Sequence, residues 1–236
     1  MTQTRRTRVV IFDLDGTLLD TLADVANAVN ATLREGGYPE HPVADCRYLL
    51  GGGVRRLFEA ALPPDARSSE QIERSVATFV THYDRNWNAT TRPYDGIPEL
   101  VAELRERDLQ QAVLSNKPHR FTRQCIAAHF GNEAAGTADD GLGPPIGPFA
   151  RVVGQRDAVP PKPDPSGALE IADALGVTPE DVLYVGDTSI DMETGRRAGM
   201  RPIGVLWGFR DRAELEEAGA ECVIGEPSDL LSLLTE

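Results

Sequence analysis

Short apolar runs alternate with amphipathic helical patterns along most of the chain. The runs are rich in Val, Ile and Leu and end at polar or turn-forming residues, which is typical of buried strands. Six runs are predicted to be strands, at residues 8–14, 110–115, 151–154, 182–187, 203–207 and 221–225. Helical patterns with clear start signals separate the later runs, as at residues 98–108 and 165–176. This alternation predicts an α/β fold with a mostly parallel sheet covered on both faces.

The first predicted strand is followed by an unusually long helical interval. About ninety residues precede the next convincing strand, too many for a single crossover. Helical periodicity begins at Asp20 and recurs at roughly 54–62 and 68–86. We therefore expect a small helical cap domain, residues 18–90, inserted into a Rossmann-like core formed by residues 1–17 and 91–236. The Gly- and Pro-rich segment 131–148 is expected to be a loop.

Composition and charge exclude several classes of function. The chain has 37 acidic and 24 basic residues and a net charge of −13, so nucleic acid or an anionic membrane would be repelled as a main partner. Three cysteines lie far apart without CxxC pairing, which argues against a disulfide framework or a zinc site. No apolar segment predicts a signal peptide or a membrane span. The expected location is the cytoplasm, and the oligomeric state is left open.

Polar side chains stand where several of the predicted strands end. Asp13 and Asp15 follow the first strand, Ser115 and Asn116 follow the second, and Asp187 ends the run 182–187. In an open parallel α/β sheet, ligands bind outside the carboxyl ends of the strands. We therefore expect these side chains to meet at one rim of the sheet.

The expected carboxylate cluster indicates phosphoryl chemistry. Asp13, Asp15 and Asp187 would repel one another unless a cation lay among them, and Mg²⁺ is the usual oxygen-bound ion beside phosphate. Lys162, one of only two lysines, would add a compact positive charge. Asp13 would attack phosphorus, Asp15 would exchange protons, and Ser115 with the following backbone N–H groups would hold phosphate oxygens.

Four segments together resemble the motifs of the haloacid dehalogenase-like superfamily, in the usual order: "DLDGTLLD", "LSNK", "PPKPDP" and "GDTSID". The resemblance covers essentially the whole chain. The helical insert resembles the first cap type of that superfamily, and its placement is most similar to that in phosphoglycolate phosphatase-type members. The resemblance implies that Asp13 is the nucleophile and Asp15 the acid/base. It also implies that Mg²⁺ is held by Asp13, the Asp15 backbone carbonyl and Asp187, while Ser115 and Lys162 hold the phosphoryl group.

Substrate contacts are expected from both parts of the chain. Besides Ser115 and Lys162, they include Asn116 from the core and, by the cap resemblance, Gly52 and Arg55. The three consecutive glycines around Gly52 would form either a substrate loop or a plain turn. Lys117 either points at the substrate or lies on the surface, and the resemblance implies that Asp191 lies outside the ligand set of the metal.

The resulting hypothesis is a Mg²⁺-dependent phosphatase that hydrolyses a small phosphorylated metabolite through an aspartyl phosphate. The first candidate substrate is 2-phosphoglycolate, and the alternatives are a sugar phosphate, a nucleotide or pyrophosphate. A sugar-phosphate mutase of the same superfamily is a further alternative. A halide-cleaving relative would not need Asp15, and a phosphorylatable receiver-like module would have no use for a cap.

Overall fold

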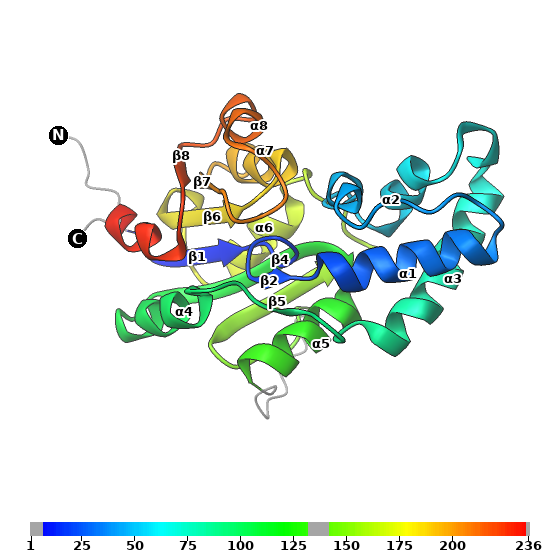
Figure 1. Ribbon diagram of the computed structural model, residues 1–236. Coiled ribbons are helices and arrows are strands. Elements are labelled where there is room, and N and C mark those ends of the chain that lie inside the picture. The colour runs from blue at the N-terminus through cyan, green and yellow to red at the C-terminus, as the bar shows by residue number, and fades with distance from the viewer. Residues whose placement is uncertain (1–6, 132–141, 235–236) are drawn as a thin grey trace.

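The structure is a computed structural model that describes residues 7–131 and 142–234. Its main sheet contains β1 (Val9–Phe12), β4 (Gln110–Pro118), β5 (Phe149–Gln155), β6 (Val182–Gly186), β7 (Arg201–Val205) and β8 (Cys222–Ile224). The strands lie in the order β5-β4-β1-β6-β7-β8, and all of their pairings are parallel (Figure 1). The predicted α/β fold is confirmed. Most of the loop expected at 131–148 lies outside the described residues.

The strand β1 lies in the middle of the sheet, and its residues are buried on both faces. Val9 and Ile11 belong to one apolar layer and Val10 and Phe12 to the other, because successive side chains of a strand point to opposite faces. The first layer contains α6 (Ser166–Ala174), and the second contains α4 (Ile97–Glu106) and α5 (His119–Phe130). The remaining elements of this part are η3 (Pro179–Asp181), α7 (Ser189–Arg197), α8 (Arg212–Glu217) and η4 (Pro227–Leu233).

The long interval after β1 is helical, as its periodicity predicts. It contains α1 (Leu22–Glu35), η1 (Asp45–Leu49), α2 (Val54–Ala61), η2 (Pro64–Ala66) and α3 (Ser69–Asn86). These helices lie together beyond the carboxyl ends of β1 and β4 (Figure 1). They share an apolar cluster that includes Val29, Phe58 and Phe79, and Phe121 and Phe209 of the sheet part also belong to it. The domain boundaries at residues 18 and 90 stay a prediction.

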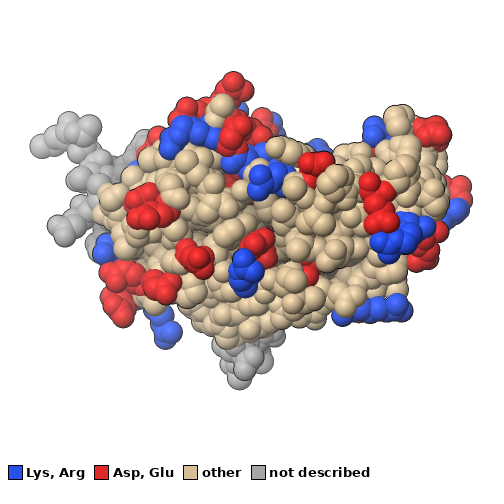
Figure 2. Space-filling model, viewed as in Figure 1, with Lys and Arg blue, Asp and Glu red and all other residues tan. Residues whose placement is uncertain are grey.

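The chain leaves and re-enters the sheet part through two adjacent segments. The two-residue strands β2 (Leu19–Asp20) and β3 (Arg92–Pro93) pair there as an antiparallel ribbon. Their shortness explains why no periodicity in the sequence predicts them. On the visible face of the molecule, acidic and basic side chains are interspersed, and the described residues form no continuous basic band there (Figure 2). Within residues 7–131 and 142–234, no helix is long and apolar enough to cross a membrane.

A buried carboxylate ties the returning segment to the first helix. Asp24 of α1 accepts hydrogen bonds from the backbone N–H of Thr90 and of Thr91, at 2.9 and 2.8 Å, and from both hydroxyl groups, at 2.8 and 2.7 Å. Burial acts to raise the pKa of Asp24, but these hydrogen bonds outweigh it and leave the pKa below its usual value. The ionised carboxylate therefore holds the two crossing segments together.

Asp24→Asn is expected to lower the free energy of unfolding at pH 7 by about 1–3 kcal/mol, because the amide turns one acceptor into a donor that faces N–H groups. Since the pKa of Asp24 is lowered on folding, its contribution is present above the usual value of 3.8 and is lost as the pH falls through the lower folded value. Urea unfolding between pH 7 and pH 3 measures the difference from the wild type. The exposed cap residue Asp65→Asn is the matched control, and an Asp24→Asn protein as stable as this control would contradict the assignment.

Candidate active site

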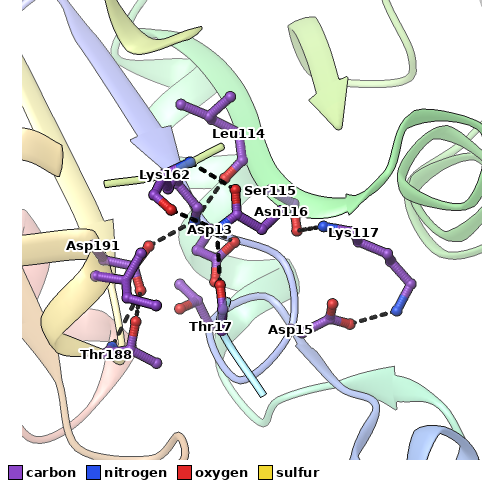
Figure 3. A network of polar contacts seen from close by, with 12 residues as sticks. Asp13, Asp15, Thr17, Leu114, Ser115, Asn116, Lys117, Lys162, Thr188 and Asp191 are labelled. Atoms are coloured by element: carbon purple, nitrogen blue, oxygen red, sulfur yellow. Dashed lines mark hydrogen bonds and ion pairs between the residues drawn. The ribbon is translucent and has the colours of Figure 1, made fainter. Parts of the chain in front are cut away.

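The polar residues expected at the strand ends do come together. Asp13 follows β1, Asp187 follows β6, and Ser115 lies in the last part of β4. Lys162 reaches the same place from the connection between β5 and α6, and Asp191 from the first turn of α7. All five side chains are buried at the carboxyl edge of the sheet. In Figure 3, Asp13, Lys162 and Asp191 point toward one another.

The ammonium group of Lys162 lies between two carboxylates. Its Nζ is 2.9 Å from Asp13 Oδ1 and 2.7 Å from Asp191 Oδ1, and it also donates a hydrogen bond of 3.1 Å to the backbone carbonyl of Leu114 (Figure 3). Burial acts to lower the pKa of Lys162, but the charges of Asp13 and Asp191 raise it well above the usual value. This lysine is therefore a permanent cation beside Asp13.

Asp13 and Asp187 carry charge that this single lysine does not neutralise. Burial raises the pKa of Asp13 to about 7, although the ammonium of Lys162 offsets part of the effect. Burial also raises the pKa of Asp187 well above its usual value, and the charges of Asp191 and Asp13 add to this, despite hydrogen bonds of 2.9 Å from the Thr17 hydroxyl and from the Phe209 N–H. The folded chain thus holds these carboxylates where ionisation is costly.

The arrangement fits a divalent cation. Carboxylate oxygens of Asp13, Asp187 and Asp191 lie within 4.8 Å of one another, and the ammonium of Lys162 contacts two of the three, Asp13 and Asp191. Asp13 Oδ1 is buried, and among the described residues it meets the ammonium of Lys162 at 2.9 Å. Both oxygens of Asp191 are already engaged, one by Lys162 and the other by the N–H and hydroxyl of Thr188. Each oxygen of Asp187 also accepts one hydrogen bond, from Thr17 and from Phe209, so the metal roles expected for Asp13 and Asp187 stay predictions. Asp191 orients Lys162.

The carboxylate of Asp15 is not part of this cluster, which corrects the side-chain grouping expected from the sequence. It points the other way, toward Lys117 (Figure 3). Its Oδ1 accepts hydrogen bonds of 2.7 Å from Lys117 Nζ and 2.7 Å from the Thr21 hydroxyl. Lys117 is buried and lies 4.8 Å from the ring centre of Tyr83 in the cap, so it is not a surface residue. The carboxylates of Asp13 and Asp15 thus occupy different electrostatic surroundings.

Asn116 and Ser115 organise the backbone around the cluster. The side-chain amide of Asn116 donates to the carbonyls of Lys162 and of Gly51, at 3.0 and 2.9 Å, and its oxygen accepts the N–H of Lys162 at 2.8 Å. Asn116 therefore fixes the segment that carries the lysine and reaches the cap. The hydroxyl of Ser115 accepts the N–H of Lys117 at 3.2 Å. The substrate roles expected for both residues stay predictions.

A pocket opens between this cluster and the cap. Charged or polar side chains at its base are Asp13, Asp15, Ser115, Asn116 and Lys117, and the cap side is mostly apolar: Val25, Leu49, Leu50, Val54, Leu57, Phe79 and Tyr83. Gly51 and Gly53 also line it, whereas Gly52 does not. Arg55 does not line it either, because its half-exposed guanidinium pairs with Glu59 and Glu73. Contact of Gly52 or Arg55 with a substrate stays a prediction.

The carboxylate of Asp187 packs against two glycines, where any larger residue would collide with it. Gly16 has a positive φ of 88°, and a Cβ at this position would collide with that carboxylate. A Cβ at Gly208 would collide with the same side chain. Thr17, which donates to Asp187, was not singled out from the sequence, although it lies inside the quoted motif. The signal available there was the hydroxyl directly after an Asp-Gly turn.

Comparisons with known proteins agree on one family. A family model described as a haloacid dehalogenase-like hydrolase matches residues 7–199. A phosphoglycolate phosphatase from Aquifex aeolicus is 34% identical over 96% of this chain and 96% of its own. An N-acetylmuramic acid 6-phosphate phosphatase from Pseudomonas aeruginosa is 32% identical over 97% of this chain and 95% of its own. The crystal structure of a provisionally assigned phosphoglycolate phosphatase from Lactobacillus delbrueckii subsp. bulgaricus has a TM-score of 0.85 at 27% identity, over 98% of this chain and all of that one.

Asp187→Asn is expected to raise the melting temperature in the presence of a chelator, because it removes one of the mutually repelling buried charges. The amide still accepts the Phe209 N–H and donates to Thr17, so the fold has no reason to change. Saturating Mg²⁺ should stabilise the wild type, by about 2.7 kcal/mol at 100 times the dissociation constant, and should leave the variant nearly unchanged. Calorimetry measures both shifts, with exposed Asp173→Asn as the control. Equal stabilisation of variant and wild type by Mg²⁺ would rule out Asp187 as a ligand.

Proposed function

Since the chain belongs to the haloacid dehalogenase-like hydrolases and is a phosphoric monoester hydrolase, we propose that it is a Mg²⁺-dependent phosphatase for a small, carboxylated phosphate monoester. The observation that carries this proposal is the placement of Asp13. It is a buried carboxylate at the end of the central strand, with a lysine ammonium 2.9 Å away and an open pocket on the cap side. A nucleophile and a fixed cation at one point suit phosphoryl transfer.

Asp13 is the proposed nucleophile. One of its oxygens forms a bond to phosphorus while the bond from phosphorus to the ester oxygen breaks, which leaves an aspartyl phosphate. Lys162 would meet the phosphoryl oxygens, and Asp191 would hold its ammonium in place through the 2.7 Å contact. Ser115, Asn116 and Lys162 remain the proposed substrate contacts from the core.

Asp15 is the proposed acid and base. It gives a proton to the departing ester oxygen and then takes one from the water that attacks the aspartyl phosphate. That second attack breaks the bond between phosphorus and Asp13 and releases phosphate. Lys117 and Thr21 both hold Oδ1 of Asp15, so we assign the proton transfers to Oδ2.

The divalent metal of the family would be held here by Asp13, Asp187 and, as the motif implies, the backbone carbonyl of Asp15. When bound, Mg²⁺ would neutralise and orient the phosphoryl oxygens. The buried cluster of three carboxylates, of which Lys162 contacts only two, supports this site. We also propose a cytoplasmic location, as expected for a chain whose three cysteines are unpaired.

The names of the relatives support a substrate that carries a carboxylate. Lys117 is the only cation among the described residues that line the pocket, and it pairs with Asp15 at 2.7 Å. The relatives are named for 2-phosphoglycolate and for N-acetylmuramic acid 6-phosphate, and both compounds carry a carboxylate besides the phosphate. We take 2-phosphoglycolate as the first candidate because several relatives are named for it. N-acetylmuramic acid 6-phosphate is the second candidate, and the largely apolar cap side leaves room for a larger alcohol.

A phosphate-release screen tests the proposed function. The panel contains the two candidates, a neutral sugar phosphate, a nucleotide and pyrophosphate, each with Mg²⁺ and with a chelator. We expect the fastest release from 2-phosphoglycolate, and none from any compound in the chelator. A preferred substrate without a carboxylate would contradict the substrate class, and full turnover in the chelator would contradict the metal. Isomer formation without phosphate release would indicate a mutase.

Substitutions of the two carboxylates in the first motif, Asp13 and Asp15, should block different steps of the reaction. Asp13→Asn removes the attacking group, so no phosphoenzyme should form. Asp15→Asn should still be phosphorylated by an aryl phosphate, whose leaving group needs little protonation, but the next step loses a general base worth about 10²–10⁴-fold. Rapid mixing followed by mass spectrometry should show an accumulated phosphate adduct on Asp15→Asn only. An adduct on Asp13→Asn, or on a residue other than Asp13 in the wild type, would overturn the assignment.

A further inference from the structure

One arginine of the sheet part reaches into the backbone of the cap. Arg210 lies between β7 and α8, and only 11% of its side chain is exposed. Its guanidinium donates hydrogen bonds to the carbonyl of Arg47 at 2.6 Å and to that of Leu50 at 3.2 Å, with the carbonyl of Tyr48 at 3.5 Å. It also lies 5.4 Å from the ring centre of Tyr48. A single side chain thus contacts the carbonyls of residues 47, 48 and 50 in one cap segment.

Two of these carbonyls lie where a helix end leaves carbonyl oxygens without intrahelical N–H donors: that of Tyr48 near the end of η1 and that of Leu50 directly after it. The carbonyl of Arg47 also accepts the N–H of Leu50 at 3.4 Å, so Arg210 gives it a second donor. A planar guanidinium suits them because it presents several N–H groups in fixed directions, and a cation is favoured at the C-terminal end of a helix. Arg210 therefore completes the end of η1 from the opposite part of the molecule.

The segment that Arg210 holds is part of the pocket wall. Leu49, Leu50 and Gly51 line the pocket above Asp13, and the carbonyl of Gly51 accepts the side-chain amide of Asn116 at 2.9 Å. Two core side chains, Arg210 and Asn116, thus hold one stretch of cap backbone from both of its ends. The position of this wall relative to the reacting groups depends on these contacts.

Arg210 is itself anchored to the metal-binding edge of the sheet. Its Nε lies 3.2 Å from Glu214, and the other oxygen of Glu214 accepts the hydroxyl and N–H of Ser189 at 2.6 and 3.2 Å. The preceding residue, Phe209, donates its N–H to Asp187. The loop that carries Arg210 is therefore fixed to Asp187, one of the proposed metal ligands, and through Glu214 to Ser189.

We propose that Arg210 is a positioning residue that fixes cap residues 47–51 over Asp13 in the substrate-binding arrangement. The kinetic part of this proposal rests on the proposed function, whereas its structural part does not. If Arg210 holds this arrangement, its loss lowers the fraction of molecules whose pocket can bind substrate. The apparent affinity for substrate then falls by the same factor. The loss of two well-formed hydrogen bonds from a charged donor predicts a rise in KM of about 10-fold or more, with kcat changed about 2-fold or less.

The test compares Arg210→Met with Arg210→Lys and with Arg212→Met. The methionine keeps the length of the side chain but has no donors, and the lysine restores one charged donor. Arg212, two residues away, is half exposed and pairs with Glu216 at 3.2 Å on its own helix, so it is the matched control. Hydrogen–deuterium exchange needs no substrate and reports residues 47–53 separately from the buried strand β6.

We expect Arg210→Met to exchange about 10-fold faster at residues 47–53, with β6 unchanged, and to show the rise in KM with any substrate that the wild type hydrolyses. Arg210→Lys should lie between it and the wild type, and Arg212→Met should match the wild type in both measurements. Unchanged exchange at 47–53 would overturn the proposal, and so would faster exchange throughout the sheet. Faster local exchange with an unchanged KM would also overturn the positioning role. If the wild type hydrolyses no phosphate ester, the proposed function is wrong. The exchange result still shows whether Arg210 fixes the cap segment.

Discussion

The ammonium of Lys162 among buried carboxylates is the interaction on which the rest of the site depends. Removing ionised groups from water is costly, and a lysine that meets both Asp13 and Asp191 makes the cluster tolerable without neutralising it. Further donors come from Thr17 and Phe209 to Asp187 and from Thr188 to Asp191. Loops from four different strand ends are held in place by this requirement. The charge that remains supports the proposal that this edge of the sheet binds a cation and phosphate.

The sequence predicted the sheet and the location of the site because both follow from short-range patterns. Apolar runs that end in polar residues identify parallel strands and the edge at which their carboxyl ends meet. The direction of a single side chain is a different matter. The expected grouping of Asp13 with Asp15 assumed that the first strand continues, but β1 ends at Phe12 and the chain turns at Gly16, so Asp15 faces Lys117 instead. Lys117 in turn is buried because β4 extends to Pro118.

Contacts between the sheet part and the cap had no sequence signal at all. Arg210 and Arg47 are far apart in the chain, and neither lies in a recognisable motif, yet one side chain joins them. The same holds for Asp24 with Thr90 and Thr91, and for Phe121 and Phe209 in the apolar cluster of the cap. Periodicity tells which face of a helix is buried but not against which partner. The residues that set the geometry of the pocket are therefore visible only in three dimensions.

The central place of β1 has a consequence for how the chain folds during synthesis. Val9 pairs with Gln110 on one side and with Val182 on the other, roughly 100 and 170 residues further along. The first strand, β1, is thus synthesised long before β6, its second neighbour in the sheet. Loop closure over such distances along the chain is slow. Until β6 emerges, Asp13 lies at an unfinished sheet edge, without Asp187 or Asp191 around it. Asp13 is made early, but its surroundings are complete only when most of the chain has been translated.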